Sequence, residues 1–415
     1  MDGPEAGAAR DRRRAWTVGI AVAVAVAVGV GLVVVLSSGG EHRRIPGAKP
    51  APGAQQPAKP APGAQQAAKP APGAQQFGVS VNRLFNDGTY TPAQIDAQLA
   101  AVHATGATIA RTDALWEASE PNAPAGGVHH YDWTFDDTIA AALARSGLRW
   151  LPIIDYTAPW AESVPGTDHS PPRSAADFAA YAAAFAARYG SGGSFWIAHP
   201  DLTQEPIETF EIWNEPDSPH FWIPTPDPVR YAGLYRSARD AILAVDPAAR
   251  VIVGGLSNPG AFLPALLAAA PELRGHIDGV AIHPYAPGPG RVISTVARAR
   301  TTLTSLGLAS VPLYVTEFGW PTLPPHSQDW APERLRPGYI ERTIAALGHV
   351  NCSLAMTILY TWVTPEHDPA DREDWFGISS PAGGDTPDVQ ALTAGLRLAR
   401  SSGPQVQACK GEGAG

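Results

Sequence analysis

The segment Thr209-Phe-Glu-Ile-Trp-Asn-Glu-Pro216 is a short run of β-favouring residues that ends in a polar turn. Its aromatic and β-branched side chains favour a strand over residues 209–214. Residues 228–245 then carry apolar side chains at helical spacing, and residues 251–255 form another short apolar run. Strand, helix and strand therefore follow one another in this part of the chain.

The same alternation continues in both directions from this segment. We expect strands over residues 77–82, 108–112, 149–155, 209–214, 251–255, 279–283, 313–317 and 357–362. The expected helices cover residues 92–105, 135–146, 175–189, 228–245, 261–270, 292–306, 337–350 and 388–399. Eight alternations predict the α/β class and a (β/α)8 TIM barrel over residues 77–400. A doubly wound open sheet is the alternative, but no G-x-G-x-x-G motif follows the first strand.

Composition limits the classes of protein to consider. The 415 residues are 45% apolar and 17% charged, which provides a core and excludes general disorder. The sequence has 30 basic and 39 acidic residues, which gives a net charge of −9. Because binding to phosphates requires a basic surface, we expect no nucleic acid partner. The sequence lacks the P-loop, G-x-S-x-G and H-E-x-x-H motifs, and we expect no cofactor and no metal.

The two cysteines, Cys352 and Cys409, either form one disulfide or are two buried thiols.

The N-terminal part of the chain is expected to lie outside the barrel. Residues 17–36 are apolar without a single charge, and about 20 such residues cross a bilayer core. Four arginines in residues 1–16 predict that this segment is a cytoplasmic tail. We therefore expect a single-pass membrane anchor with the catalytic domain outside the cell. The alternative is a cleaved signal peptide and a secreted protein.

Residues 37–76 are expected to be a disordered linker. The octapeptide Lys-Pro-Ala-Pro-Gly-Ala-Gln-Gln begins at Lys49, Lys59 and Lys69, and its proline content favours extended polyproline II. A proline-rich recognition ligand is the alternative. At the other end, residues 401–415 are predicted to form a short tail, and the barrel is expected to be monomeric.

Two glutamates stand where expected strands end. Glu215 follows the fourth strand and Glu317 ends the seventh. Strands four and seven lie on opposite sides of an eight-stranded ring, so the two carboxylates are expected to face each other across its mouth. Cleavage of a glycosidic bond needs one carboxyl group to protonate the leaving oxygen and one to attack the anomeric carbon. We expect these two groups to be about 5–5.5 Å apart.

The strings Trp213-Asn-Glu-Pro216 and Thr316-Glu-Phe-Gly-Trp320, with the barrel around them, resemble the clan A glycoside hydrolases. These are retaining enzymes on a (β/α)8 fold, and the similarity extends over residues 77–400. The opening Phe77-Gly-Val-Ser-Val-Asn82 and the long third loop are most like family 39, with family 5 close behind. The resemblance implies that Glu215 is the acid/base and Glu317 the nucleophile.

The resemblance also implies residues that bind the sugar. Asn214 matches the residue that contacts the 2-hydroxyl group, and Arg111 matches an arginine beside the nucleophile. His283 and Tyr285 match a pair that flanks the nucleophile, and Trp362 matches an aromatic platform beneath the sugar.

Other candidates come from the loops themselves. Tryptophans in βα loops can stack on the apolar faces of sugars, and we expect this of Trp160, Trp222 and Trp375. Trp320 and Trp330 are expected to pack loops instead. Acidic residues there either bind sugar hydroxyl groups or bridge loops, and both interpretations stay open for Glu117, Glu120 and Asp155.

These observations predict a retaining glycoside hydrolase. It would cleave β-glycosidic bonds in an extracellular or cell-envelope polysaccharide by a two-glutamate double displacement, while its N-terminal helix contacts the membrane. Its partner would be a polysaccharide or oligosaccharide substrate. The alternative is a carbohydrate-binding barrel without catalytic activity.

Overall fold

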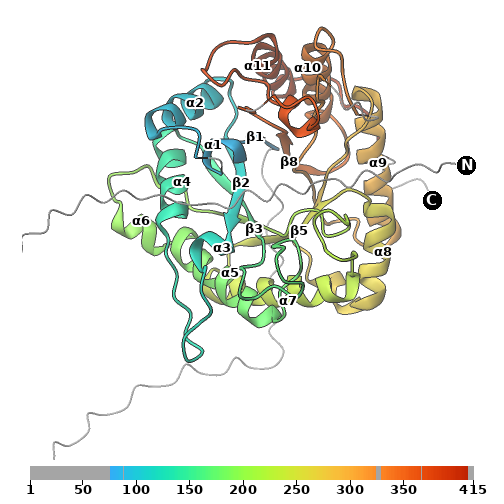
Figure 1. Cartoon of the computed structure of the whole chain (residues 1–415). Coiled ribbons are helices and arrows are strands. Elements are labelled where there is room, and N and C mark those ends of the chain that lie inside the picture. The colour runs from blue at the N-terminus through green and yellow to red at the C-terminus, as the bar shows by residue number, and fades with distance from the viewer. Residues whose placement is uncertain (1–74, 87, 324–328, 366, 410–415) are drawn as a thin grey trace, which may run out of the picture. The chain divides into compact units, whose positions relative to one another are not determined.

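Eight parallel strands form a closed barrel in the computed structural model, which describes residues 75–86, 88–323, 329–365 and 367–409 (Figure 1). The strands pair in chain order, from β1 with β2 around to β8 with β1. They are β1 Gln76–Ser80, β2 Ile109–Leu115, β3 Arg149–Asp155, β4 Thr209–Ile212, β5 Arg250–Leu256, β6 Val280–Ile282, β7 Leu313–Val315 and β8 Leu354–Leu359. The predicted (β/α)8 barrel is confirmed.

Helices surround the strands in Figure 1. The longer ones are α2 Pro92–Ala104, α4 Thr134–Arg145, α5 Ala175–Tyr189, α7 Pro228–Val245, α8 Pro259–Ala269, α9 Pro289–Ser305, α10 Arg336–Leu347 and α11 Pro387–Ala399. Short turns of helix, namely α1 Asn82–Phe85, α3 Trp116–Ser119, α6 Ser194–Ala198, η1 Pro271–Gly275 and η2 Arg372–Trp375, lie in the connections. The local sequence determines where a helix begins. At the start of α7, the side chain of Asp227 accepts hydrogen bonds from the N–H groups of Val229 and Arg230.

The barrel interior changes from apolar to polar along its axis. Near the start of the strands, a buried cluster fills the ring with Ile109, Leu151, Ile252, Ala281, Tyr314, Ala355, Met356 and Ile358. Because side chains alternate along a strand, the next inward position on β2 after Ile109 is Arg111. Arg111 and Glu211 of β4 are buried and joined there. The apolar layer therefore closes the base of the barrel beneath a charged layer.

Five of the eight strands, β1, β4, β6, β7 and β8, end earlier than their sequence patterns predict. β4 stops at Ile212, and both Trp213 and Glu215 then take positive φ angles, 67° and 43°. Residues other than glycine rarely adopt this left-handed backbone conformation. Here it turns the chain sharply at the end of the strand. β8 is Leu354–Leu359 rather than residues 357–362, so that Tyr360, not Trp362, is the first residue beyond it.

No helix within the described residues is both long and apolar enough to cross a bilayer. The predicted membrane helix at residues 17–36, the tail at residues 1–16 and the linker up to residue 74 lie outside the described residues.

A disulfide joins Cys352, just before β8, to Cys409. Asn351 strengthens this connection, since its side-chain oxygen accepts hydrogen bonds from the N–H groups of Ala408 and Cys409. The C-terminal segment is therefore attached to the barrel as far as Cys409. Of the two states left open by the sequence, the structure has the bonded one.

Replacing both cysteines with serine is expected to lower the free energy of unfolding by about 4 kcal/mol. The disulfide closes a loop with a sequence separation of 57 residues, and opening it restores freedom to the unfolded chain. Urea unfolding of the oxidised protein, the reduced protein and the double variant measures this. A reduced protein as stable as the oxidised one would contradict the prediction.

Candidate active site

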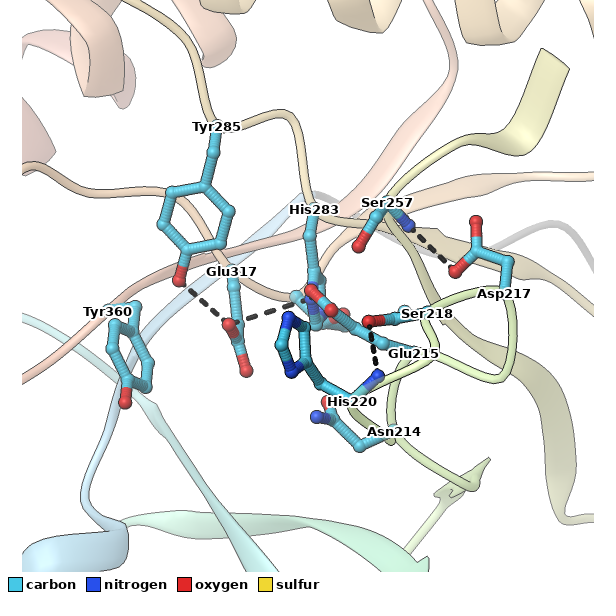
Figure 2. A network of polar contacts seen from close by, with 12 residues as sticks. Asn214, Glu215, Asp217, Ser218, His220, Ser257, His283, Tyr285, Glu317 and Tyr360 are labelled. Carbon is cyan, nitrogen blue, oxygen red and sulfur yellow. Dashed lines mark hydrogen bonds and ion pairs between the residues drawn. The ribbon is translucent and has the colours of Figure 1, made fainter. Parts of the chain in front are cut away.

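A cavity of about 1320 Å³ opens at the carboxyl ends of the strands and contains both predicted catalytic glutamates. Glu215, Glu317 and His283 each place one nitrogen or oxygen atom within 4.8 Å of the other two. In Figure 2 the three side chains converge on one point from three different loops. The structure thus brings together the ends of β4, β6 and β7, as expected from the sequence.

Glu317 is held by two hydrogen-bond donors. The Arg111 guanidinium donates to its Oε1 at 2.6 Å. The Tyr285 hydroxyl donates to its Oε2 at 2.7 Å (Figure 2). Burial raises the pKa of Glu317, but the positive charges of His283 and Arg111 and these hydrogen bonds outweigh burial. The net effect is a pKa below the ordinary value of 4.5, so that Glu317 is a carboxylate at neutral pH.

Arg111 connects Glu317 to the rest of the barrel interior. Its Nε donates to Glu211 at 2.8 Å, and an NH2 proton goes to the Asn214 side-chain oxygen at 3.0 Å. Burial opposes the charge of Arg111, but Glu211 and Glu317 outweigh this and raise its pKa. Arg111 therefore fixes the nucleophile candidate and Asn214 at the same time.

Glu211 is a site residue that the sequence analysis missed. This buried carboxylate also accepts hydrogen bonds from the Thr316 hydroxyl at 3.0 Å and from the Gly255 N–H at 2.8 Å. A signal was present, because a glutamate inside a strand covered on both faces must point into the barrel to find a partner.

His283 and Glu215 share a proton. The Thr316 hydroxyl gives its only hydrogen to Glu211, so its oxygen accepts from Nε2–H of His283 at 3.1 Å. Nδ1 of His283 then lies 2.8 Å from Oε1 of Glu215, with one proton between them. Burial lowers the pKa of His283, but the charges of Glu317 and Glu215 outweigh it and raise the pKa. Nδ1 of His283 and Oε1 of Glu215 therefore hold a proton between them.

The same three groups could in principle hold a cation. Both oxygens of Glu317 are already engaged by Arg111 and Tyr285, and the fixed positive charge of Arg111 lies 2.6 Å away. Repulsion from that charge makes the cluster a poor cation site and a good pair of acid and base groups.

The four tryptophans predicted to contact sugar do not line the cavity. Trp362 is fully buried, and its indole N–H donates to Gln98 at 2.7 Å. Trp222 is buried against Trp213, while Trp160 and Trp375 donate to the backbone oxygens of Glu120 and Asp368. The expectation for Trp362 is wrong because β8 ends at Leu359, which places Tyr360 at the cavity instead. Trp160, Trp222 and Trp375 pack between loops instead. Trp320 is also buried, as expected.

Other aromatic rings form the wall of the cavity. Tyr156, His169 and Phe221 lie against one another, with ring centroids between 4.5 and 6.3 Å apart. Tyr360 also lines the cavity, and its hydroxyl donates to Glu373 at 3.1 Å. Burial raises the pKa of Glu373 to about 7. His169 and Phe221 come from long loops, where no periodic pattern indicates which side chains meet.

The acidic candidates have different surroundings. Glu120 accepts from the Trp116 indole and lies 2.9 Å from His129, so the structure favours the loop-bridging interpretation. Asp155 is buried, and its side-chain oxygens have no hydrogen-bond partner within the described part of the chain. Burial, followed by the charge of Asp113, raises the pKa of Asp155 well above its ordinary value. Asp155 does not line the cavity, so the geometry does not support direct sugar binding by it.

The structure is similar to several solved structures. A GH39 β-xylosidase from Caulobacter crescentus aligns over 79% of this chain and 72% of its own, with 21% identity and a TM-score of 0.58. A GH39 enzyme from Xanthomonas axonopodis pv. citri aligns over 78% and 67%, with 20% identity and a TM-score of 0.59. A GH5_18 structure from Streptomyces cattleya in complex with GlcNAc aligns over 81% and 82%, with 18% identity and a TM-score of 0.57.

This chain has the fold of those glycoside hydrolases. The resemblance expected from the sequence, to family 39 first and family 5 next, is confirmed by these structural neighbours. No protein-family model matches the sequence, and no curated protein is significantly similar to it. At these identities the likeness establishes the fold, and the activity has to be argued from the site.

Proposed function

We propose that this protein is a retaining glycoside hydrolase that cleaves β-glycosidic bonds in an extracellular or cell-envelope polysaccharide. The observation that carries the proposal is the approach of Glu215 and Glu317, with carboxylate oxygens within 4.8 Å of each other in the wall of an open cavity. Inverting enzymes place their carboxyl groups about 6.5–9.5 Å apart to admit a water molecule. The short separation here favours direct attack by one carboxylate and hence retention.

In the first step Glu317 attacks the anomeric carbon while Glu215 protonates the leaving oxygen. The bond between sugar and leaving group breaks, and a covalent bond between Glu317 and the sugar forms. Arg111 and Tyr285 keep Glu317 ionised for this attack. The proton shared by Glu215 and His283 goes to the leaving group.

In the second step water hydrolyses the covalent bond between Glu317 and the sugar. Glu215, now without its proton, removes a proton from water, and the resulting hydroxide attacks the anomeric carbon and releases Glu317. Two displacements restore the original anomeric configuration. The wall made by Tyr156, His169 and Phe221 provides apolar ring faces against which sugar C–H groups can pack.

Two further observations support the β-linkage and the location. Structural neighbours include a β-xylosidase and fungal β-1,4-galactanases, the latter with a TM-score of 0.51. The Cys352–Cys409 disulfide suits an oxidising compartment outside the cytoplasm. Together with the apolar segment at residues 17–36, it supports a membrane-anchored protein with an external barrel, or a secreted one if that segment is a cleaved signal.

The test is to incubate the full-length chain with aryl β-glycosides and β-linked polysaccharides and to follow the products by NMR. We expect release of the β-anomer first, followed by mutarotation. Initial release of the α-anomer would overturn the retaining mechanism. Binding without any release would favour the non-catalytic carbohydrate-binding barrel.

Tyr285→Phe is expected to shift the acid limb of the pH profile upward by about one unit. In the wild type, kcat/KM should fall only below pH 4.5, where Glu317 with its lowered pKa takes up a proton. The variant loses the hydroxyl donor to Glu317, so its carboxylate is protonated at higher pH. A profile of kcat/KM between pH 3 and 8 on an aryl glycoside measures this, and an unchanged acid limb would contradict it.

A further inference from the structure

One face of helix α9 carries basic side chains into the cavity. Arg291, Thr295 and Arg298 are spaced by four and three residues, so they lie on the same side of the helix. All three line the same cavity as Glu215 and Glu317. The Arg298 guanidinium donates to the Thr295 hydroxyl at 2.7 Å, which directs it along the helix towards Arg291.

These two arginines differ from the others in the cavity. Arg83 pairs with Asp374, and Arg372 pairs with Asp329 and Glu373. Arg291 and Arg298 are exposed and form no ion pair with any acidic residue in the described ranges. Two positive charges without an acidic partner therefore border the cavity that also contains Glu215 and Glu317.

This placement contrasts with the charge of the protein as a whole. The chain has a net charge of −9, and residues 75–409 contain no lysine, so that every fixed positive side chain of the barrel is an arginine. A guanidinium presents two parallel N–H groups that fit the oxygens of a carboxylate or a sulfate. A net negative protein does not attract polyanions in general, so binding of an acidic glycan requires a local basic surface, which this face provides.

We propose that the α9 face is a binding subsite for the anionic groups of an acidic polysaccharide, carboxylates of uronic acids or sulfate esters. The proposal rests on the proposed glycoside hydrolase function, because it assigns the substrate class of that same cavity. Arg291 and Arg298 are seven residues apart, or about 10 Å along the helix. They can therefore engage two anionic groups of one glycan chain, while Thr295 offers its hydroxyl between them.

The test measures glycan binding by the full-length chain carrying Glu317→Gln, so that no substrate is consumed. Alginate and hyaluronan are compared with their carboxyl-reduced forms, and chondroitin sulfate with its desulfated and carboxyl-reduced form. We expect at least one acidic polymer to bind at least about tenfold more tightly than its neutral counterpart. Adding Arg291→Ala and Arg298→Ala should remove that preference and leave binding of the counterpart unchanged.

A matched control removes two other exposed arginines, by Arg236→Ala and Arg397→Ala. Neither lines the cavity, so the same change in net charge should leave the preference intact. Alanine is favourable within a helix, so each variant is expected to fold. Equal binding of every acidic polymer and its counterpart, or a preference that survives in the α9 variant, would overturn the subsite.

The subsite and the proposed function fail in different ways. Cleavage of neutral aryl glycosides without any acidic preference would overturn the subsite and keep the hydrolase. An acidic preference that depends on Arg291 and Arg298, in a protein that cleaves no glycan, would support the subsite as a binding site and overturn the hydrolase.

Discussion

Glu317→Gln is expected to lower kcat on an aryl β-glycoside by about 10⁵-fold or more, with little change in the folded structure. Glutamine keeps the size of the side chain: its amide oxygen can accept from Arg111, and its NH2 group can donate to the oxygen of Tyr285. It cannot form the covalent intermediate, because the amide is a poor nucleophile. Initial rates and circular dichroism measure the two parts of this prediction.

Chemical rescue distinguishes the roles of the two glutamates. Azide added to Glu317→Ala should occupy the vacated space and give a glycosyl azide of inverted configuration. Azide added to Glu215→Ala should attack the covalent intermediate instead and give a product of retained configuration. The reverse pattern would contradict the assignment of acid/base and nucleophile. Glu117→Gln, a glutamate that does not line the cavity, is the matched control and should keep full activity.

Arg111→Met is expected to lower the free energy of unfolding by about 3–5 kcal/mol and the melting temperature by roughly 6–15 °C. Arg111 lies between Glu211 and Glu317, and all three are buried. Removing the cation leaves two carboxylates without their compensating charge. Activity should fall as well, since Glu317 loses one of the groups that keep its pKa low. Thermal and urea unfolding at pH 7 provide the measurement.

A second variant tests whether charge is the cause. Arg111→Met combined with Glu211→Gln should recover part of the lost stability, because only one buried carboxylate then lacks the compensating charge of Arg111. Arg145→Met, which breaks an exposed ion pair with Asp96, should cost less than about 1 kcal/mol. Equal losses in Arg111→Met and Arg145→Met would contradict a buried charge network.

The site shows where prediction from sequence succeeds. Glu215, Asn214, His283 and Glu317 stand within three residues of the observed ends of β4, β6 and β7. In a parallel barrel every strand ends at the same face, so a polar residue directly after an apolar run has a known position. Their convergence could therefore be predicted without knowing a single distance.

Prediction was less successful for the residues that surround the sugar-binding space. Trp160, Trp222 and Trp375 are used for packing between loops, and Tyr156, His169 and Phe221 line the cavity in their place. An indole can bury its ring in either setting, so residue type does not distinguish the two. The three-residue difference in β8 had the same effect, because it exchanged Trp362 for Tyr360 at the cavity.

The order of strands and helices, the closed barrel and the two glutamates at its mouth were determined by the sequence alone. Those features depend on periodicity and on the position of a residue relative to the end of a strand, both of which are local. The Arg111–Glu211–Thr316–His283 connections, the aromatic wall and the basic face of α9 were decided only by the tertiary structure. The first two depend on side chains from separate strands and loops, whose distances are set when the barrel closes and the loops pack. The third depends on which face of α9 borders the cavity once the helix has packed on the barrel.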